Sequence, residues 1–268
     1  MCEFYGFIGC GNMGAPLARA AAKTLSGGQM MLANRTPSKA EALAEELGCL
    51  VGENTDVARQ AGTIFLGVKP QMMADMLRGI APVLAARTDR FVLVTMAAGL
   101  TIARIREMAG GDYPVIRIMP NTPASIGEGM ILYAAEGVTE EELERFLYTM
   151  AAAGRFDALP ENLIDAGSAV SGCGPAFVYP FIEALADGAV ACGLPRAKAQ
   201  EYAAQTLVGA AKLVLESGQH PGALKDAVCS PGGSTIAGVR ALEQGGFRSA
   251  ATEAVIAAYE KTKALGKQ

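Results

Sequence analysis

Three glycines near the start of the chain have the types and spacing that bind a phosphate. Gly9, Gly11 and Gly14 follow a short apolar run and form the pattern G-x-G-x-x-G. In this pattern the first glycine allows a tight turn, the second lets a pyrophosphate approach the backbone, and the third lets a helix pack close to its strand. The helix that follows begins with unpaired N–H groups, which attract an anion. Glycines also occur in turns that bind nothing, so the pattern alone leaves both interpretations open. The predicted pyrophosphate loop consists of Gly9, Cys10, Gly11, Asn12, Met13 and Gly14.

The residues after the next apolar run indicate which dinucleotide is preferred. The run at 30–33 ends at Asn34, Arg35 and Thr36. A fold that binds NAD usually has an acidic residue here for the ribose 2′-hydroxyl, and this chain has none. Arg35 supplies a fork of donors that suits a 2′-phosphate. We therefore predict NADPH as the cofactor and NADH as the alternative. The competing interpretation is that Arg35 is a solvated loop cation.

Apolar strands must alternate with helices to position these turns. The runs at 63–68, 91–95 and 115–119 are almost continuously apolar, which is typical of buried parallel strands. Ligands of open α/β sheets bind beyond the carboxyl ends of such strands, so the turns that follow are candidate cofactor walls. Each of them, taken singly, could equally be an ordinary turn. We also expect an edge strand at 130–134, a helix at 140–150 and a closing strand at 154–159.

The second half of the chain is helical. Helices are expected from 174 to about 193 and from about 196 to 215, with apolar residues on more than one face. A helix that is apolar nearly all round must be buried on nearly all sides, and this part of the chain is too short to bury several. We therefore predict that these helices pack against a second subunit; the alternative is a self-sufficient bundle. Pro180, Glu183 and Asp187 interrupt the apolar stretch, so we expect no membrane span.

Composition restricts the class of protein. A length of 268 residues favours two domains, and a net charge of −4 gives no reason to expect a nucleic acid partner. Six scattered cysteines and a single histidine favour free thiols over a metal site and indicate a reducing cytoplasm. We interpret that histidine, His220, as a loop or C-cap residue and not as a base. Cys10 and Cys229 are expected to make the protein sensitive to thiol reagents.

A second anion site is predicted between residues 224 and 238. A loop, Ser230-Pro231-Gly232-Gly233, ends where a new helix starts at Ser234 and Thr235. Two glycines bring bare backbone N–H groups to a helix start, where a carboxylate fits, and Thr235 places a hydroxyl nearby. The competing interpretation is an ordinary helix with Ser234 as its N-cap.

Across essentially its whole length the chain resembles the pyrroline-5-carboxylate reductase family. The family signature is matched by Leu224-Lys225-Asp226 and by the stretch from Cys229 to Gly238, and the order of the other motifs adds specificity. These are Phe7-Ile8-Gly9-x-Gly11-Asn12-Met13, Val68-Lys69-Pro70-Gln71, Met119-Pro120-Asn121-Thr122-Pro123, Ser171-Gly172-x-Gly174-Pro175-Ala176 and His220-Pro221-Gly222.

The resemblance implies an α/β fold: an N-terminal Rossmann-type doubly wound sheet (1–160) followed by an all-α C-terminal dimerisation and substrate domain (161–268). It implies homodimers or larger rings of dimers, with a pyrroline pocket between two subunits. It also implies roles for residues. Asn34, Arg35 and Thr36 would hold the 2′-phosphate, and Asn54 would lie near the adenosine. The nicotinamide end would be lined by Val68, Lys69, Pro70, Ala97 and Ala98. The substrate carboxylate would be held by Ser230, Gly232, Gly233, Ser234 and Thr235, with the Thr235 hydroxyl near the ring nitrogen as the catalytic group.

The implied reaction is hydride transfer from NADPH to the C=N carbon of a cyclic imine, which gives L-proline. Some family members have a glutamate and an asparagine near the pocket where this chain has Gly218 and Ala227, so neither position receives a role. One alternative is a β-hydroxyacid dehydrogenase, which needs a lysine base early in the second domain; this chain has no lysine between 162 and 194. The other is a non-catalytic NADPH-binding regulator.

Overall fold

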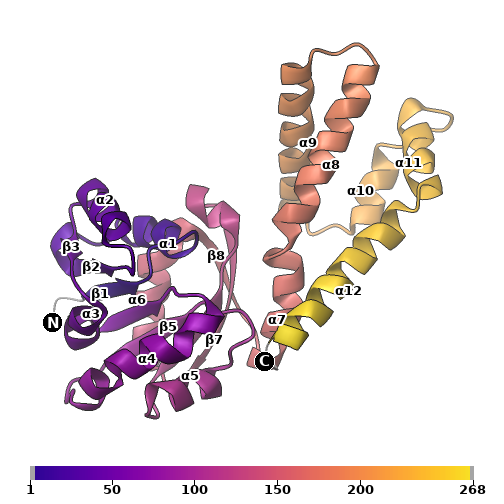
Figure 1. Ribbon diagram of the computed structural model, residues 1–268. Coiled ribbons are helices and arrows are strands. Elements are labelled where there is room, and N and C mark those ends of the chain that lie inside the picture. Colours follow the sequence, from indigo (N-terminus) through magenta and orange to yellow (C-terminus); the bar gives the residue numbers. More distant parts are fainter. Residues whose placement is uncertain (1–3, 266–268) are drawn as a thin grey trace. The chain divides into compact units, whose positions relative to one another are not determined.

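The computed structural model describes residues 4–265 and divides the chain into two compact units (Figure 1). The first extends to residue 173 and includes the chain from residue 258 onward, and the second is 174–257. The predicted division at 160/161 differs from this one because the helix Glu161–Ser171 packs within the first unit. Its Ile164 is fully buried in the core of that unit. The boundary at residue 160 stays a prediction.

The first unit is built on an eight-stranded sheet with the order β3-β2-β1-β4-β5-β6-β7-β8. Its first six strands are parallel, and β7 runs antiparallel to β6 while β8 runs parallel to β7. The doubly wound α/β prediction is therefore confirmed. The strands are β1 (Tyr5–Ile8), β2 (Met30–Ala33), β3 (Leu50–Val51), β4 (Thr63–Leu66), β5 (Val92–Thr95), β6 (Val115–Met119), β7 (Gly129–Glu136) and β8 (Gly154–Ala158).

Helices cover both faces of this sheet because its central strands are apolar on both sides. One face packs against α3, α4, α5 and α7, and the other packs against α1, α2 and α6. Two consecutive residues of β1 show this division. Phe7 packs in the core on the face of α1, α2 and α6, and Ile8 packs in the core on the face of α3, α4, α5 and α7. The helices are α1 (Gly14–Ala21), α2 (Pro37–Leu47), α3 (Asn54–Gln60), α4 (Pro70–Ala85), α5 (Ile102–Ala109), α6 (Glu140–Met150) and α7 (Glu161–Ser171), with 3₁₀ turns at Gly27–Gln29 (η1), Thr122–Ile126 (η2) and Ala151–Ala153 (η3).

One expectation about the strands was wrong, and one strand was missed. The run at 130–134 was expected to form an edge strand, but β7 lies between β6 and β8, and β8 forms the edge. Strand β3 was not expected at all. It has only two residues, both exposed, so it carries no apolar pattern that would reveal it.

The second unit contains helices with little apolar core of their own. Helices α8 and α9 pack together through Ala186, Ala199 and Ala203, all of them small and buried. Large apolar side chains on the same helices are exposed, among them Tyr179 and Leu215. A self-sufficient bundle would bury such side chains, so this surface favours the predicted second subunit. The helices are α8 (Gly174–Ala191), α9 (Arg196–Ser217), α10 (Pro221–Ala227), α11 (Ser234–Gln244) and α12 (Phe247–Leu265), the last shared with the first unit.

One helical segment of the described chain, 161–191, is long and apolar enough to cross a membrane by length and composition. Only 11% of its most apolar window is buried. A single such segment is weak evidence for a membrane span, since helices that pack against another subunit have the same composition.

Candidate functional site: two glycine-lined helix starts

The first glycine loop joins β1 to α1 and fits tightly against the turn after β4. Gly9 has a φ of +101°, and a Cβ atom there would lie 2.5 Å from the carbonyl oxygen of Gly67. A Cβ atom on Gly14 would lie 2.0 Å from the carbonyl oxygen of Gly9. Both positions therefore require glycine for the fold itself.

Gly11 differs from its two neighbours in the pattern. An ideal Cβ atom at Gly11 would meet no described atom within 4 Å, so the protein itself leaves that space open. Met13, the N-cap of α1, makes no side-chain capping bond within residues 4–265. The Ala15 N–H donates to the Gly11 carbonyl (3.0 Å), so the loop combines a helix start that no N-cap side chain caps with open space at Gly11, an arrangement that suits a phosphate.

Hydrogen bonds tie the glycine loop to the turn after β2. The Gly9 N–H donates to the Ala33 carbonyl (2.8 Å), and the Cys10 N–H donates to Asn34 Oδ1 (3.0 Å). Asn34 Nδ2 in turn donates to the Thr36 carbonyl (2.9 Å). The Cys10 N–H and the Asn34 side chain, both expected to hold phosphate groups, are therefore engaged with each other.

Cys10 is buried, and this changes what was expected of its thiol. Its Sγ donates to the Ala33 carbonyl (3.8 Å), and burial raises the pKa of Cys10 to about 11. A thiol attacks reagents as the thiolate, so burial and the raised pKa both disfavour reaction at Cys10. The sequence gives no measure of how deeply the loop is packed, and the sensitivity of Cys10 to thiol reagents stays a prediction. Cys229 is half-buried and stays a candidate for reaction.

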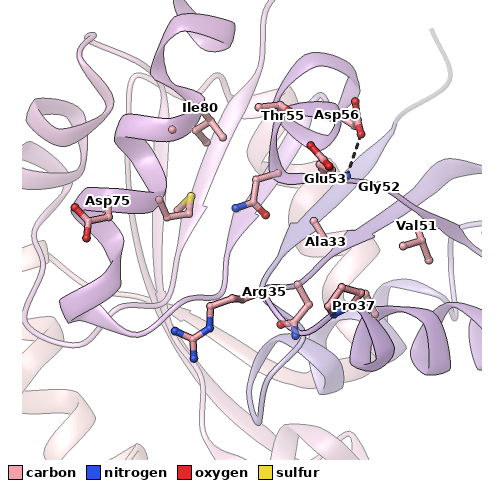
Figure 2. Close-up of a pocket in the computed structure, with 15 residues that line it drawn as sticks. Ala33, Arg35, Pro37, Val51, Gly52, Glu53, Thr55, Asp56, Asp75 and Ile80 are labelled. Carbon is pink, nitrogen blue, oxygen red and sulfur yellow. Dashed lines mark hydrogen bonds between the residues drawn. The ribbon is translucent and has the colours of Figure 1, made fainter.

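A pocket of about 640 Å³ opens beside the turn after β2 (Figure 2). Figure 2 shows the Arg35 side chain along its rim, with Asp75 and Ile80 on one side and Val51 and Pro37 on the other. Arg35 is exposed, and its Nη1 lies 3.7 Å from the Met72 sulfur. The lining residues expected from sequence were Asn34, Arg35 and Asn54; residues of α4 that sequence analysis missed include Met76, Gly79 and Ile80. The missed residues lie on one face of α4 at helical spacing, a signal that was present in the sequence.

The residues expected at the nicotinamide end follow two neighbouring strands. Leu66 of β4 pairs with Thr95 of β5 in the sheet, so the turns after these strands begin side by side. Lys69 is the exposed N-cap of α4, and Pro70 is the first residue of that helix. Val68 and Ala97 pack against the core, whereas Ala98 is exposed. These five residues lie outside the 640 Å³ pocket, whose lining includes Arg35 and Asn54, the residues expected near the 2′-phosphate and the adenosine.

A buried side chain behind these turns holds α7 to the sheet. The Asn121 Oδ1 accepts from the Met130 N–H (3.0 Å), and its Nδ2 donates to the Ser171 carbonyl (2.9 Å). Ser171 Oγ is itself buried, with no hydrogen-bond partner among the described residues.

The second glycine loop, in the second unit, leads into α11. The Gly233 N–H donates to the Ser230 carbonyl (3.0 Å), Gly232 has a φ of +69°, and Gly233 is the N-cap of α11. Ser234 is the first residue of the helix, so the interpretation of Ser234 as N-cap was wrong. Because the N-cap is glycine, no side chain within 4–265 caps this helix. The backbone N–H groups of its first turn, including that of the exposed Thr235, are left for a ligand or for water.

His220 caps a helix. It is the N-cap of α10, and its Nδ1 accepts from the Gly222 N–H (3.0 Å). It begins a helix, so its interpretation as a C-cap was wrong. Gly218 ends α9 and Ala227 ends α10. The residues 4–265 hold no group of three His, Cys, Asp or Glu side chains placed to bind a metal.

Comparison with known proteins covers both units. Residues 161–265 match the family model described as pyrroline-5-carboxylate reductase dimerisation, and residues 5–99 match the model of coenzyme F420-dependent NADP oxidoreductases. The pyrroline-5-carboxylate reductase of Escherichia coli is 42% identical over 266 residues, which is 98% of each chain. The chain belongs to the pyrroline-5-carboxylate reductase family. The enzyme of that name from Pisum sativum is 40% identical over 97% of this chain and 95% of its own length.

A solved structure from the same family contains a bound nucleotide. The Plasmodium falciparum pyrroline carboxylate reductase, crystallised with NADP bound, superposes with a TM-score of 0.88 at 33% identity and covers 98% of each chain. The family match confirms the predicted combination of a Rossmann-type sheet with a helical dimerisation domain.

Proposed function

We propose that this protein uses NADPH to reduce L-1-pyrroline-5-carboxylate to L-proline, the last step of proline biosynthesis. One observation carries this proposal: the chain matches enzymes named pyrroline-5-carboxylate reductase over 98% of its length, and the match includes both glycine-lined helix starts. The proposed activity is that of an oxidoreductase acting on a C=N bond.

The first loop fits a dinucleotide. Gly9 and Gly14 are fixed by close backbone contacts, whereas the space beside Gly11 is open and lies at the start of an uncapped helix. A pyrophosphate in that space would accept from the first N–H groups of α1. Arg35 at the rim of the 640 Å³ pocket would pair with a 2′-phosphate, which supports NADPH over NADH. The nicotinamide would supply the hydride, with Val68, Lys69, Pro70, Ala97 and Ala98 around it.

The second loop fits a small carboxylate. The N–H groups of Ser234 and Thr235 begin α11 after Gly232 and Gly233, and the positive end of the α11 dipole favours an anion there. Holding the carboxylate at this point would place the ring nitrogen within reach of the Thr235 hydroxyl. That hydroxyl can donate to the nitrogen or accept from it.

The chemistry requires positioning more than a dedicated acid. An imine accepts hydride well when protonated, and the loop proposed to hold the substrate, residues 230–235, contains no His, Asp or Glu that would protonate it. Holding two reactants in line supplies roughly 7–11 kcal/mol, whereas one general acid contributes about 3–5 kcal/mol. A substrate that arrives protonated, or takes its proton through Thr235 or from water, therefore needs no further acid.

The dimerisation model and the exposed apolar faces of α8 and α9 support a homo-oligomer. We further propose a dimer, or a ring of dimers, formed by the helices of the second unit. A cytoplasmic location, and the absence of nucleic acid and membrane partners, stay predictions.

The decisive experiment mixes the protein with NADPH and L-1-pyrroline-5-carboxylate and follows the absorbance of the reduced cofactor. We expect the absorbance to fall and L-proline to accumulate in equal amounts. Binding of NADPH without any decay would favour a non-catalytic regulator. Parallel reactions with NADP⁺ and a panel of β-hydroxyacids test the other alternative: turnover there, with none on the imine, would show a β-hydroxyacid dehydrogenase.

A further inference from the structure

The side chain of Asn34 connects the two segments that are expected to hold phosphate groups. Its Oδ1 accepts from the N–H of Cys10 in the glycine loop (3.0 Å), and its Nδ2 donates to the Thr36 carbonyl (2.9 Å). Cys10 is 24 positions earlier in the chain, while Thr36 belongs to the turn that carries Arg35. One amide group therefore bridges the predicted pyrophosphate loop and the predicted 2′-phosphate turn.

This bridge begins where the sheet ends. The strands β1 and β2 pair in parallel up to Ile8 and Ala33, and the last backbone bond between them joins the Gly9 N–H to the Ala33 carbonyl (2.8 Å). The next N–H, that of Cys10, is bonded by the Asn34 side chain. Asn34 thus extends the connection between the two chains by one residue after their backbones separate.

The two partners also define the orientation of the amide. The Cys10 N–H requires an acceptor and the Thr36 carbonyl requires a donor, so Oδ1 must face Cys10 and Nδ2 must face Thr36. An aspartate could keep the first bond but not the second, and it would add a negative charge beside Arg35. An alanine could make neither bond. Asparagine is therefore specifically suited to this position.

We propose that Asn34 is a positioning residue that anchors the glycine loop to the turn after β2 and so holds the loop in the conformation that binds the pyrophosphate of a dinucleotide. This inference rests on the proposed function. NADPH and NADH carry the same pyrophosphate, so loosening of this loop weakens the binding of both cofactors. Arg35 is the ligand of the 2′-phosphate: it is exposed at the pocket rim, and its guanidinium lies near the weakly accepting Met72 sulfur (3.7 Å).

The test compares NADPH and NADH binding to the full-length protein, measured by calorimetric titration without substrate. Asn34→Ala is expected to weaken both nucleotides by a similar factor, about ten-fold, because it loosens the loop that every dinucleotide uses. Arg35→Ala is expected to weaken NADPH by about ten-fold or more and to leave NADH nearly unchanged. The ratio of the two affinities is therefore preserved in the first variant and lost in the second.

Asn34→Asp is the conservative variant. It keeps the acceptor for the Cys10 N–H and places a charge beside the 2′-phosphate site, so it should bind NADH close to wild type and NADPH much more weakly. Retained NADH binding in Asn34→Asp, beside the loss in Asn34→Ala, would show that the acceptor for the Cys10 N–H is what holds the loop. Kinetics should agree, with KM for both cofactors raised in Asn34→Ala by more than kcat falls.

Two results would overturn the inference. If Asn34→Ala weakened NADPH and left NADH unchanged, Asn34 would be a ligand of the 2′-phosphate and not a positioning residue. If it changed neither affinity, the bridge would be irrelevant to binding. Failure of the wild-type protein to bind either nucleotide would instead overturn the proposed function, on which this inference depends.

Discussion

The carbonyl oxygen of Gly9 lies so close to Gly14 that a Cβ atom on Gly14 would be 2.0 Å from it. At Gly11, by contrast, an ideal Cβ would meet no described atom within 4 Å. Three glycines that look equivalent in the sequence therefore have different reasons to be there. Gly14 is required by the packing of α1 on its strand, whereas Gly11 leaves space that the protein does not use.

Substitution of these two glycines by alanine should separate folding from binding. Gly14→Ala forces two backbone segments apart, so we expect a clearly lower Tm and loss of activity together. Gly11→Ala meets open space, so its Tm should stay close to wild type while the affinity for NADPH falls by ten-fold or more. Thermal unfolding of the free protein and titration with NADPH measure the two effects. A Gly11→Ala variant that bound NADPH normally would show that the pyrophosphate lies elsewhere.

Arg117 is the largest fully buried side chain of the first unit and should be important for stability. Its Nη1 bonds Glu161 Oε1 (3.3 Å) and its Nη2 bonds Asp165 Oδ1 (2.5 Å), which connects β6 to α7. Arg117→Ala would leave two partly buried carboxylates unpaired. We expect a loss of about 3 kcal/mol in the free energy of unfolding, measured in urea, which is at the low end for a buried pair because both carboxylates are partly exposed.

The matched control for that experiment is Arg104→Ala. Arg104 pairs with Glu107 on the surface of α5, where both side chains are more than half exposed. Such pairs contribute less than about 1 kcal/mol. Equal losses in the two variants would contradict the role given to the buried cluster.

Thr235 is expected to act on the ring nitrogen of the substrate. Thr235→Ala should lower kcat/KM by roughly ten- to a hundred-fold, equivalent to one hydrogen bond of about 1.4–2.8 kcal/mol. Thr235→Ser keeps the hydroxyl and should retain most of the activity. Steady-state kinetics with saturating NADPH measures both. Unchanged kinetics in Thr235→Ala would remove this residue from the mechanism.

Cys10 should make the protein less stable in alkaline solution. Burial raises the pKa of Cys10 from about 9.0 to about 11, so the folded state keeps the proton that the unfolded state loses. The contribution of this thiol to stability is therefore complete below pH 9 and is lost as the pH rises through 11. Cys10→Ser does not titrate in this range, so its free energy of unfolding should fall less than that of wild type between pH 9 and 11. Parallel pH profiles for the two proteins would refute this prediction.

Sequence patterns predicted the fold of the first unit well because its strands are apolar on both faces. Almost continuously apolar runs, such as 63–66 and 92–95, indicated buried parallel strands, and the helices between them followed. The position of β7 could not be predicted in the same way. An antiparallel strand inside a sheet and one at its edge have similar sequences, and only the pairing of β7 with β8 decides between them.

The candidate site was predicted in part. The spacing of Gly9, Gly11 and Gly14 and the motif at 230–235 identified two helix starts that can bind anions, because glycine and helix geometry act locally along the chain. Sequence did not reveal that Asn34 is engaged with Cys10, because that bond joins residues 24 positions apart.

By itself, the sequence determined the family of this protein, its two glycine-lined helix starts and the cation available for a 2′-phosphate. These features depend on residue type and short-range spacing. Only the tertiary structure decided which glycine is required for packing, which thiol is buried and which amide is a bridge. Each of those properties depends on how closely segments that are remote in the chain approach one another and on which side chains they bury.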